Sequence, residues 1–279
     1  MAISPTSGNC TSGAFVSLGS QRARINGPFP LGAAAAVAVA LLASGCGGSK
    51  SAGAEGNTSS NAAKLPQTTT YTTVKSLPLD SGTDGGDGTV VRPAKDLPIS
   101  ATPGGPAVAT LPTTQLGGPT WVPVVESKPG WRRVLLPSRP NRATGWVPDN
   151  GGLTVARSPY TIKVDLSDRK LTLAKAGKTT GAWKVAVGDA KTPTPTGRTF
   201  LLALLKPAKP TFSPLILPVG THSATLDSFG GGPGTVAFHG WTDKAVFGKA
   251  VTHGCVRVPA DALTQLSSVA LGTPVLITD

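Results

Sequence analysis

The sequence predicts a mainly β protein with one or two short helices. Gly (35 residues) and Pro (26) are abundant in the 279-residue chain, whereas aromatic residues make up 5% and charged residues 14%. This composition favours turn-rich β structure over a helical bundle. Short apolar runs separated by turn residues fill most of the chain after residue 88, and residues 261–271 show helical spacing.

Residues 1–46 have the features of a leader for export. Arg22 and Arg24 precede an apolar run at residues 31–43 that is too short to span a membrane, and small residues lead to Cys46. The residues Ala-Ser-Gly-Cys at 43–46 resemble a bacterial lipobox, in which Cys46 is lipidated. We therefore expect a lipid-anchored protein outside the cytoplasm, facing the cell wall. An ordinary signal peptide cut nearby, or an uncleaved anchor, is the alternative.

Residues 47–88 are rich in Gly, Ser, Thr, Asn and Ala and contain almost no apolar clusters. Such a segment buries too little surface to fold, so the sequence predicts a disordered linker. Roughly forty flexible residues have a root-mean-square span on the order of 35 Å, which is enough to lift a domain away from a membrane.

Residues 89–156 are predicted to form a small β-barrel of five or six strands, because short apolar runs alternate there with Gly- and Pro-containing turns. Gly-Trp pairs that end at Trp131 and Trp146 make this segment similar to bacterial SH3-like domains. The two tryptophans could line a groove for wall peptide or glycan. We favour a place in the barrel core, because aromatic side chains dominate small cores.

Residues 159–279 are predicted to form a second, mostly antiparallel β domain. Strands are expected at residues 160–165, 170–174, 182–187, 199–205, 235–238 and 274–278, with a hairpin around Asp168. Residues 206–234 are rich in Gly and Pro and are expected to form a loop. The helical spacing at residues 261–271 ends at Gly272.

The residues Thr-His-Gly-Cys-Val-Arg at 252–257 follow the pair His239-Gly240. A thiol attacks a carbonyl as the thiolate, so it needs an imidazole within reach and a third group that holds the imidazole. After export Cys255 would be a lone free thiol in an oxidising compartment, which indicates either reactivity or complete burial. The alternative is a small buried Cys255 with unrelated histidines.

The C-terminal domain resembles the L,D-transpeptidase catalytic domain of the YkuD type. The resemblance rests on Val-Asp-Leu-Ser-Asp-Arg-Lys-Leu at 164–171, Gly188 with Thr-Pro-Thr-Pro-Thr-Gly at 192–197, His-Gly at 239–240, and residues 252–257. With an SH3-like domain and a lipobox in front, the order of segments looks like that of actinobacterial members.

This resemblance implies an acyltransferase that acts on peptidoglycan stem peptides. The thiolate would attack the carbonyl of the third stem residue and release terminal D-Ala. An amine of another stem would then capture the thioester as a 3→3 cross-link. Water as acceptor would make the protein an L,D-carboxypeptidase, and carbapenems would acylate Cys255.

The resemblance also implies the role of each site residue. Cys255 is the expected nucleophile and His239 its base, while the Gly240 carbonyl fixes the imidazole tautomer. His253 is expected to line the site and support the cysteine loop. The backbone N–H groups of Gly254 and Cys255 are expected to form part of an oxyanion hole.

Arg257, Trp241 and Thr252 are expected to bind substrate, and Arg257 could instead form a structural ion pair. Three features depart from the family pattern, one of which is Val258-Pro259 in place of the more usual Met and polar residue after the Arg. Trp241 stands where a small or hydroxylated residue is more usual, and residues 211–220 lack the tyrosines often found in the flap over the site. His222 is interpreted as a loop residue.

Other function classes fit the sequence less well. A zinc site built from the histidines and Cys255 lacks HExxH or paired CxxC spacing, so no metal and no other cofactor is expected. The net charge of +12 is diffuse, which disfavours a nucleic-acid partner and suits an anionic wall. A monomer is expected, and a non-catalytic wall-binding lipoprotein with a degenerate site is the non-enzymatic alternative.

Overall fold

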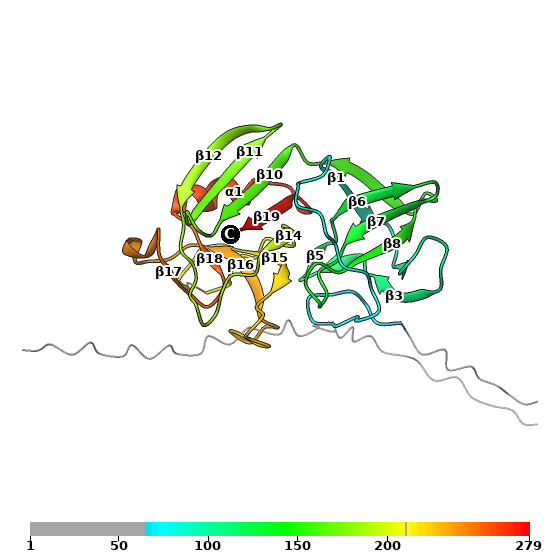
Figure 1. Ribbon diagram of the computed structural model, residues 1–279, viewed down its shortest axis with the longest axis horizontal. Coiled ribbons are helices and arrows are strands. Elements are labelled where there is room, and N and C mark those ends of the chain that lie inside the picture. The colour runs from blue at the N-terminus through cyan, green and yellow to red at the C-terminus, as the bar shows by residue number, and fades with distance from the viewer. Residues whose placement is uncertain (1–64, 210) are drawn as a thin grey trace, which may run out of the picture. The chain divides into compact units, whose positions relative to one another are not determined.

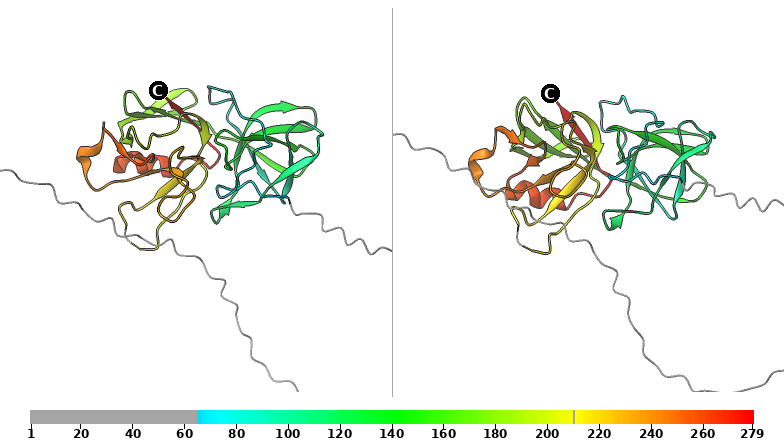
Figure 2. Two further views of the ribbon diagram at one scale, coloured as in Figure 1. Left: turned by 60° about the horizontal axis from the view of Figure 1, so that its bottom comes forward. Right: turned by 90° about the horizontal axis from the view of Figure 1, so that it is seen from below.

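The computed structural model describes residues 65–209 and 211–279. The predicted leader, the lipobox at Cys46 and the first part of the linker lie outside the described residues. The predicted mainly β fold is confirmed (Figures 1 and 2). Within the described ranges, no helix has the length and apolar character needed to cross a membrane.

The first part of the described chain is a seven-stranded sheet with the strand order β3-β2-β8-β7-β6-β1-β9, in which the paired neighbours are antiparallel. Its strands, with the short β4–β5 pair beside them, are β1 (Thr89–Pro93), β2 (Leu97–Ser100), β3 (Ala107–Leu111), β4 (Thr114–Gln115), β5 (Gly118–Pro119), β6 (Val122–Lys128), β7 (Trp131–Leu135), β8 (Thr144–Pro148) and β9 (Leu153–Arg157). Alternate side chains of these strands fill one hydrophobic core. The likeness to an SH3 domain stays a prediction.

The two tryptophans of this sheet differ in burial. Trp146 is 4% exposed, so its predicted place in the core is confirmed, and the amine of Lys128 lies 5.0 Å from its ring centroid. Trp131 is only half-buried at the start of β7.

The predicted disordered linker is wrong from residue 65 onward. Residues 65–88, here called the strap, form isolated bridges to the sheet, such as Gln67 with Thr110 and Leu79 with Ala143. Val74 and Leu77 are buried in the core of the sheet. The composition concealed this order because single apolar residues and backbone hydrogen bonds anchor the strap, and neither produces an apolar cluster in the sequence.

The strap also contacts the C-terminal part of the chain through a buried ion pair. The Arg198 guanidinium donates to both carboxylate oxygens of Asp80, at 2.8 and 2.6 Å, and to Asp84 at 3.2 Å. The side chains of Arg198 and Asp80 are 7% and 1% exposed. Because a buried charge without a partner is costly, this bidentate pair ties the strap to β14.

The C-terminal part has a five-stranded sheet (β12-β11-β10-β19-β14), a three-stranded sheet (β15-β16-β18) and a two-stranded one (β13-β17) around one core. The elements are β10 (Tyr160–Asp165), β11 (Lys170–Lys175), β12 (Lys178–Lys184), β13 (Val187–Gly188), β14 (Gly197–Phe200), β15 (Ile216–His222), β16 (Thr235–His239), the 3₁₀ turn η1 (Lys244–Val246), β17 (Ala250–Thr252), β18 (Val256–Arg257), α1 (Ala260–Ser267) and β19 (Pro274–Thr278).

Several predicted elements of this part are confirmed. The β10–β11 hairpin forms at Asp168, and Arg169 in its turn has φ of 48°. The predicted helix is α1, which buries Ala262, Leu263 and Leu266 and ends four residues earlier than Gly272 would suggest. The prediction of a mostly antiparallel domain is confirmed by the β10–β11, β11–β12, β14–β19 and β15–β16 pairings, whereas β10–β19, β13–β17 and β16–β18 are parallel.

The predicted loop at residues 206–234 is also wrong in its middle, where β15 pairs with β16. Pro218 and Gly220 suggested a turn, yet both lie in this buried strand. Pro218 still uses its carbonyl, which accepts from Leu202 N–H at 2.8 Å. A side chain at Gly220 would collide with the ring of Phe200, so glycine is needed there for close packing.

Candidate active site

The parallel pairing of β16 with β18 (Figure 1) brings the two sequence motifs together. The register sets Phe238 opposite Val256 and His239 opposite Arg257. Cys255 precedes β18 by one residue and is held near Ala237, whose backbone hydrogen-bonds the thiol. Side chains two residues apart on a strand share a face, and paired strands lie ~4.8 Å apart. Cys255 and His239 are therefore diagonal neighbours on one face of this sheet.

The Gly240 carbonyl orients the imidazole of His239. The ring nitrogen Nδ1 lies 2.7 Å from the Gly240 oxygen, which can only accept, so Nδ1 carries the proton and Nε2 has a free lone pair. His239 is 7% exposed. Burial is the main cause that lowers the pKa of His239 to about 4, and the nearby charge of Arg257 also lowers it. The hydrogen bond to Gly240 acts in the opposite direction and raises the pKa. The imidazole is neutral at pH 7, as a general base must be.

The thiol of Cys255 is also neutral at rest. Burial raises its pKa above the usual value, and this effect outweighs the opposing effects of the Ala237 backbone and of Arg257. The directions of both pKa shifts favour a neutral thiol beside a neutral imidazole. The arrangement suits proton transfer from Sγ to Nε2 as the sulfur attacks.

The hydroxyl of Thr252 shapes the cysteine loop. It donates to the Cys255 carbonyl at 2.6 Å and accepts from Gly254 N–H at 3.1 Å, and Gly254 has φ of 110°. The oxyanion role predicted for Gly254 N–H therefore needs correction, because this donor already binds Thr252 Oγ1. A threonine hydroxyl readily caps a turn in this way. Thr252 acts here through the loop backbone.

The Thr-Pro-Thr segment of the sequence motif braces the same loop. Thr192 Oγ1 donates to the Thr252 carbonyl at 2.9 Å, and Thr194 Oγ1 donates to the Gly254 carbonyl at 2.8 Å. Thr194 Oγ1 also accepts from Gly188 N–H at 2.9 Å. No role in the site was predicted for this segment. The sequence sign of this bracing role is the alternation of Thr with Pro. A residue before Pro is extended, so threonines two residues apart point in the same direction.

His253 is exposed, and its ring centroid lies 5.2 Å from that of Phe229, itself 51% exposed. The support that we predicted from His253 comes instead from the hydroxyls of Thr252, Thr192 and Thr194. His253 lies between a buried threonine and a buried glycine on a tight turn, which turns its side chain outward.

Arg257 and Trp241 contact each other beside the base. The guanidinium lies 3.5 Å from the Trp241 ring centroid, a close cation–π contact. The Phe212 ring meets His239 edge-on at 4.8 Å and lies 5.4 Å from Trp241. Sequence reasoning missed Phe212. Residues 211–220 contain no tyrosine, and only residues 211–215 precede the buried strand β15.

His222 lies at the end of β15 and is not a loop residue. It is 1% exposed, and its Nε2 lies 2.8 Å from the Thr70 carbonyl, to which it donates. Burial lowers its pKa to about 4. Asn141 binds the His222 backbone from the sheet side, accepting from its N–H at 2.8 Å and donating to its carbonyl at 2.7 Å. His222 is thus an anchor for the strap.

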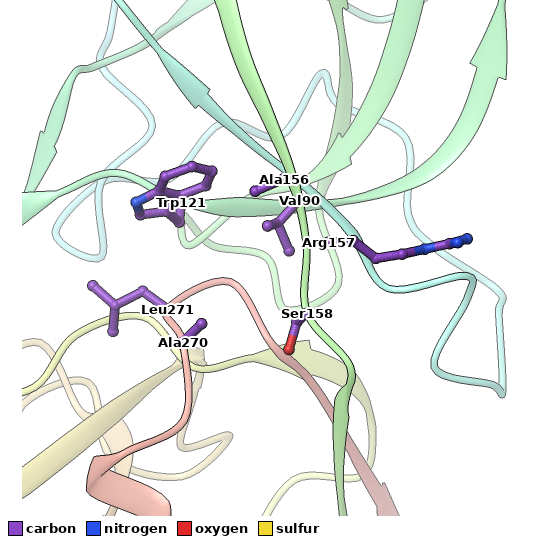
Figure 3. A pocket seen from close by; sticks show the side chains of 7 residues that line it. All are labelled: Val90, Trp121, Ala156, Arg157, Ser158, Ala270 and Leu271. Carbon is purple, nitrogen blue, oxygen red and sulfur yellow. The ribbon is translucent and has the colours of Figure 1, made fainter. Parts of the chain in front are cut away.

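A pocket of about 240 Å³ lies away from this site (Figure 3). Apolar side chains dominate its lining, which is formed by Val90, Trp121, Ala156, Arg157, Ser158, Ala270 and Leu271. It includes none of the residues of the cysteine site. In the described part of the chain, no three His, Cys, Asp or Glu side chains gather where they could hold a metal ion.

Part of the chain is similar to known proteins. Residues 159–277 match the YkuD family model, described as the L,D-transpeptidase catalytic domain. A curated protein of Bacillus subtilis (strain 168), named for L,D-transpeptidase YkuD, is 29% identical over 111 residues, or 40% of this chain. The chain spans 60% of that relative's length.

Solved structures of L,D-transpeptidases are also similar to this chain. An L,D-transpeptidase from Mycobacterium smegmatis is 17% identical, with 57% of this chain and 82% of that one covered and a TM-score of 0.36. The catalytic domain of the E. faecium L,D-transpeptidase is 24% identical, with 42% and 95% covered and a TM-score of 0.34. L,D-transpeptidase 3 from Mycobacterium tuberculosis, in complex with a faropenem-derived adduct, is 14% identical, with 57% and 93% covered and a TM-score of 0.37.

Proposed function

We propose that this protein is a peptidoglycan L,D-transpeptidase that uses Cys255 as a covalent nucleophile. The observation that carries the proposal is the β16–β18 register, which sets the thiol diagonally beside a neutral imidazole with its Nε2 lone pair free. The match of residues 159–277 to the L,D-transpeptidase catalytic domain supports the substrate class.

The first half-reaction forms a thioester. His239 Nε2 takes the thiol proton as Sγ bonds to the carbonyl carbon of the third residue of a tetrapeptide stem. The C–N bond to terminal D-Ala then breaks, and the imidazolium returns the proton to the departing amine. The Cys255 N–H is the proposed donor to the oxyanion, since Gly254 N–H binds Thr252.

The second half-reaction transfers the acyl group. The side-chain amine of another stem attacks the thioester and gives its proton to His239, and the product is a 3→3 cross-link with the thiol restored. Water in place of the amine would give an L,D-carboxypeptidase. A carbapenem would acylate the same sulfur by opening its strained lactam.

The location proposed for the protein follows from the features of residues 1–46 and from its net charge. Export through residues 1–46 and lipidation of Cys46 would tether a basic chain under an anionic wall, since the net charge of +12 falls only to +10 when Arg22 and Arg24 are removed. A monomer suffices, because Cys255 and His239 belong to one chain.

Incubation of the full chain with a disaccharide-tetrapeptide, followed by mass spectrometry, tests the proposal. We expect loss of D-Ala and a cross-linked dimer, both absent in Cys255→Ala. Loss of D-Ala without a dimer would favour the carboxypeptidase. A chain that neither turns over substrate nor forms a carbapenem adduct would be a wall-binding lipoprotein with a degenerate site.

A further inference from the structure

Ser213 occupies a buried position next to the backbone that holds the base. Its side chain is 1% exposed, and Oγ lies 2.7 Å from Gly240 N and 2.6 Å from the Leu215 carbonyl oxygen. A hydroxyl has one proton. Because the Leu215 oxygen can only accept, that proton points to Leu215, and an oxygen lone pair must face Gly240 N–H.

The backbone of Gly240 needs a hydrogen bond of this kind to hold its conformation. A glycine has no Cβ and rotates about φ and ψ more freely than any other residue. A side chain at Gly240 would begin 3.2 Å from Ser213 Oγ, so the absence of a side chain is what allows the serine to approach this closely. The Gly240 N–H and the Gly240 carbonyl belong to the two peptide units that flank one Cα, and Ser213 fixes the first of them.

The second of these peptide units orients the base. The Gly240 carbonyl accepts from His239 Nδ1 at 2.7 Å, which leaves Nε2 unprotonated. Phe212, the neighbour of Ser213, packs its ring edge-on against the same imidazole at 4.8 Å. The segment at residues 211–215 therefore contacts His239 directly and through Gly240.

We propose that Ser213 is a positioning residue for the general base: it holds Gly240 so that the imidazole of His239 keeps the tautomer with Nε2 free. This inference rests on the proposed function and deepens it. A purely structural serine would only satisfy two buried backbone groups, and its removal would then lower stability without changing the tautomer.

Nitrogen-15 NMR of the side-chain histidines in the full chain separates these two roles without any substrate. In the wild type, His239 should show a protonated Nδ1 and an unprotonated Nε2 at pH 7. Ser213→Ala should give a mixture of both tautomers, and Ser213→Thr, which keeps the hydroxyl, should restore the single tautomer. A His239→Gln spectrum assigns the signals.

The rate of Cys255 acylation by a carbapenem gives the second readout. Ser213→Ala should slow acylation between about 10- and 100-fold, since small misplacements of a catalytic group have effects of this size. The matched control is Ser158→Ala, which removes a hydroxyl 2.6 Å from Thr273 Oγ1 outside the site. It should lower the melting temperature while leaving the acylation rate and the tautomer unchanged.

An unchanged tautomer in Ser213→Ala, or a rate loss equal to that of Ser158→Ala, would overturn the inference. The two proposals fail separately. A chain without turnover whose His239 tautomer still responds to Ser213→Ala would refute the transpeptidase and leave the positioning role standing.

Discussion

His239 and Arg257 lie opposite each other across the parallel strands β16 and β18. Their pairing places Cys255, two residues before Arg257, diagonally next to the imidazole. It also places a fixed positive charge beside the base, which contributes to lowering the pKa of His239. The strand register thus sets Cys255 and Arg257 beside the imidazole, whose pKa is lowered mainly by burial and further by Arg257.

The decline of the acylation rate at acidic pH should follow the protonation of His239. The base works only when neutral, and burial lowers its pKa to about 4 from an ordinary value near 6.5. The rate of carbapenem acylation should therefore stay constant as pH falls from 7 to about 5 and decline only near 4. Stopped-flow measurement of the acylation rate across this pH range checks the prediction. A half-maximal rate near pH 6.5 would show that His239 is not the buried neutral base described above.

Stability should fall in the same acidic range because His222, like His239, has a lowered pKa in the folded chain. Its folded pKa of about 4 lies below the unfolded value near 6.5, so the unfolded chain binds more protons between these pH values. The contribution is fully present above about pH 6.5 and is lost as pH falls toward 4. Urea unfolding at several pH values measures it. His222→Gln should flatten the slope relative to the wild type, and an equal slope in both would contradict the account.

Arg198→Met should destabilise the protein strongly, because it leaves Asp80 buried without its partner. Breaking a buried ion pair costs about 3–5 kcal/mol. The matched control is Arg157→Met, which removes the exposed partner of Asp87, with side chains 67% and 60% exposed. We expect about 1 kcal/mol or less there. Similar midpoints of denaturation for the two variants would mean that the strap is not tied to β14.

Thr194→Val should slow acylation about 10-fold by releasing the Gly254 carbonyl and leaving Gly188 N–H unpaired. Thr180→Val is the control, because Thr180 Oγ1 donates to the Leu173 carbonyl at 3.2 Å on the β11–β12 hairpin. It should acylate at the wild-type rate. Equal rates in wild type and Thr194→Val would show that the Thr-Pro-Thr segment does not brace the cysteine loop.

The sequence predicted those features that depend on local patterns. The β10–β11 hairpin, α1 and β19 each carry an alternation, a helical period or a turn signal within one segment. The pairing of His239 with Cys255 also came from sequence, through motifs whose chemistry needs both residues.

The features that the sequence did not predict depend on contacts between residues that are far apart in the chain. The strap is ordered by Asp80 with Arg198 and by Thr70 with His222, pairs separated by more than a hundred residues. The buried strand β15 contains Pro218 and Gly220, which are tolerated because of their neighbours. Ser213 and Phe212 have no motif of their own, since their role depends on the fold that brings them to His239.

The most direct test of the central claim is the intact mass of the full chain mixed with a disaccharide-tetrapeptide and quenched in acid. The account predicts an adduct equal to the substrate less D-Ala, located by peptide mapping on Cys255, present in the wild type and absent in Cys255→Ala. An adduct that persists in Cys255→Ala, or release of D-Ala by that variant, would contradict covalent catalysis by this thiol.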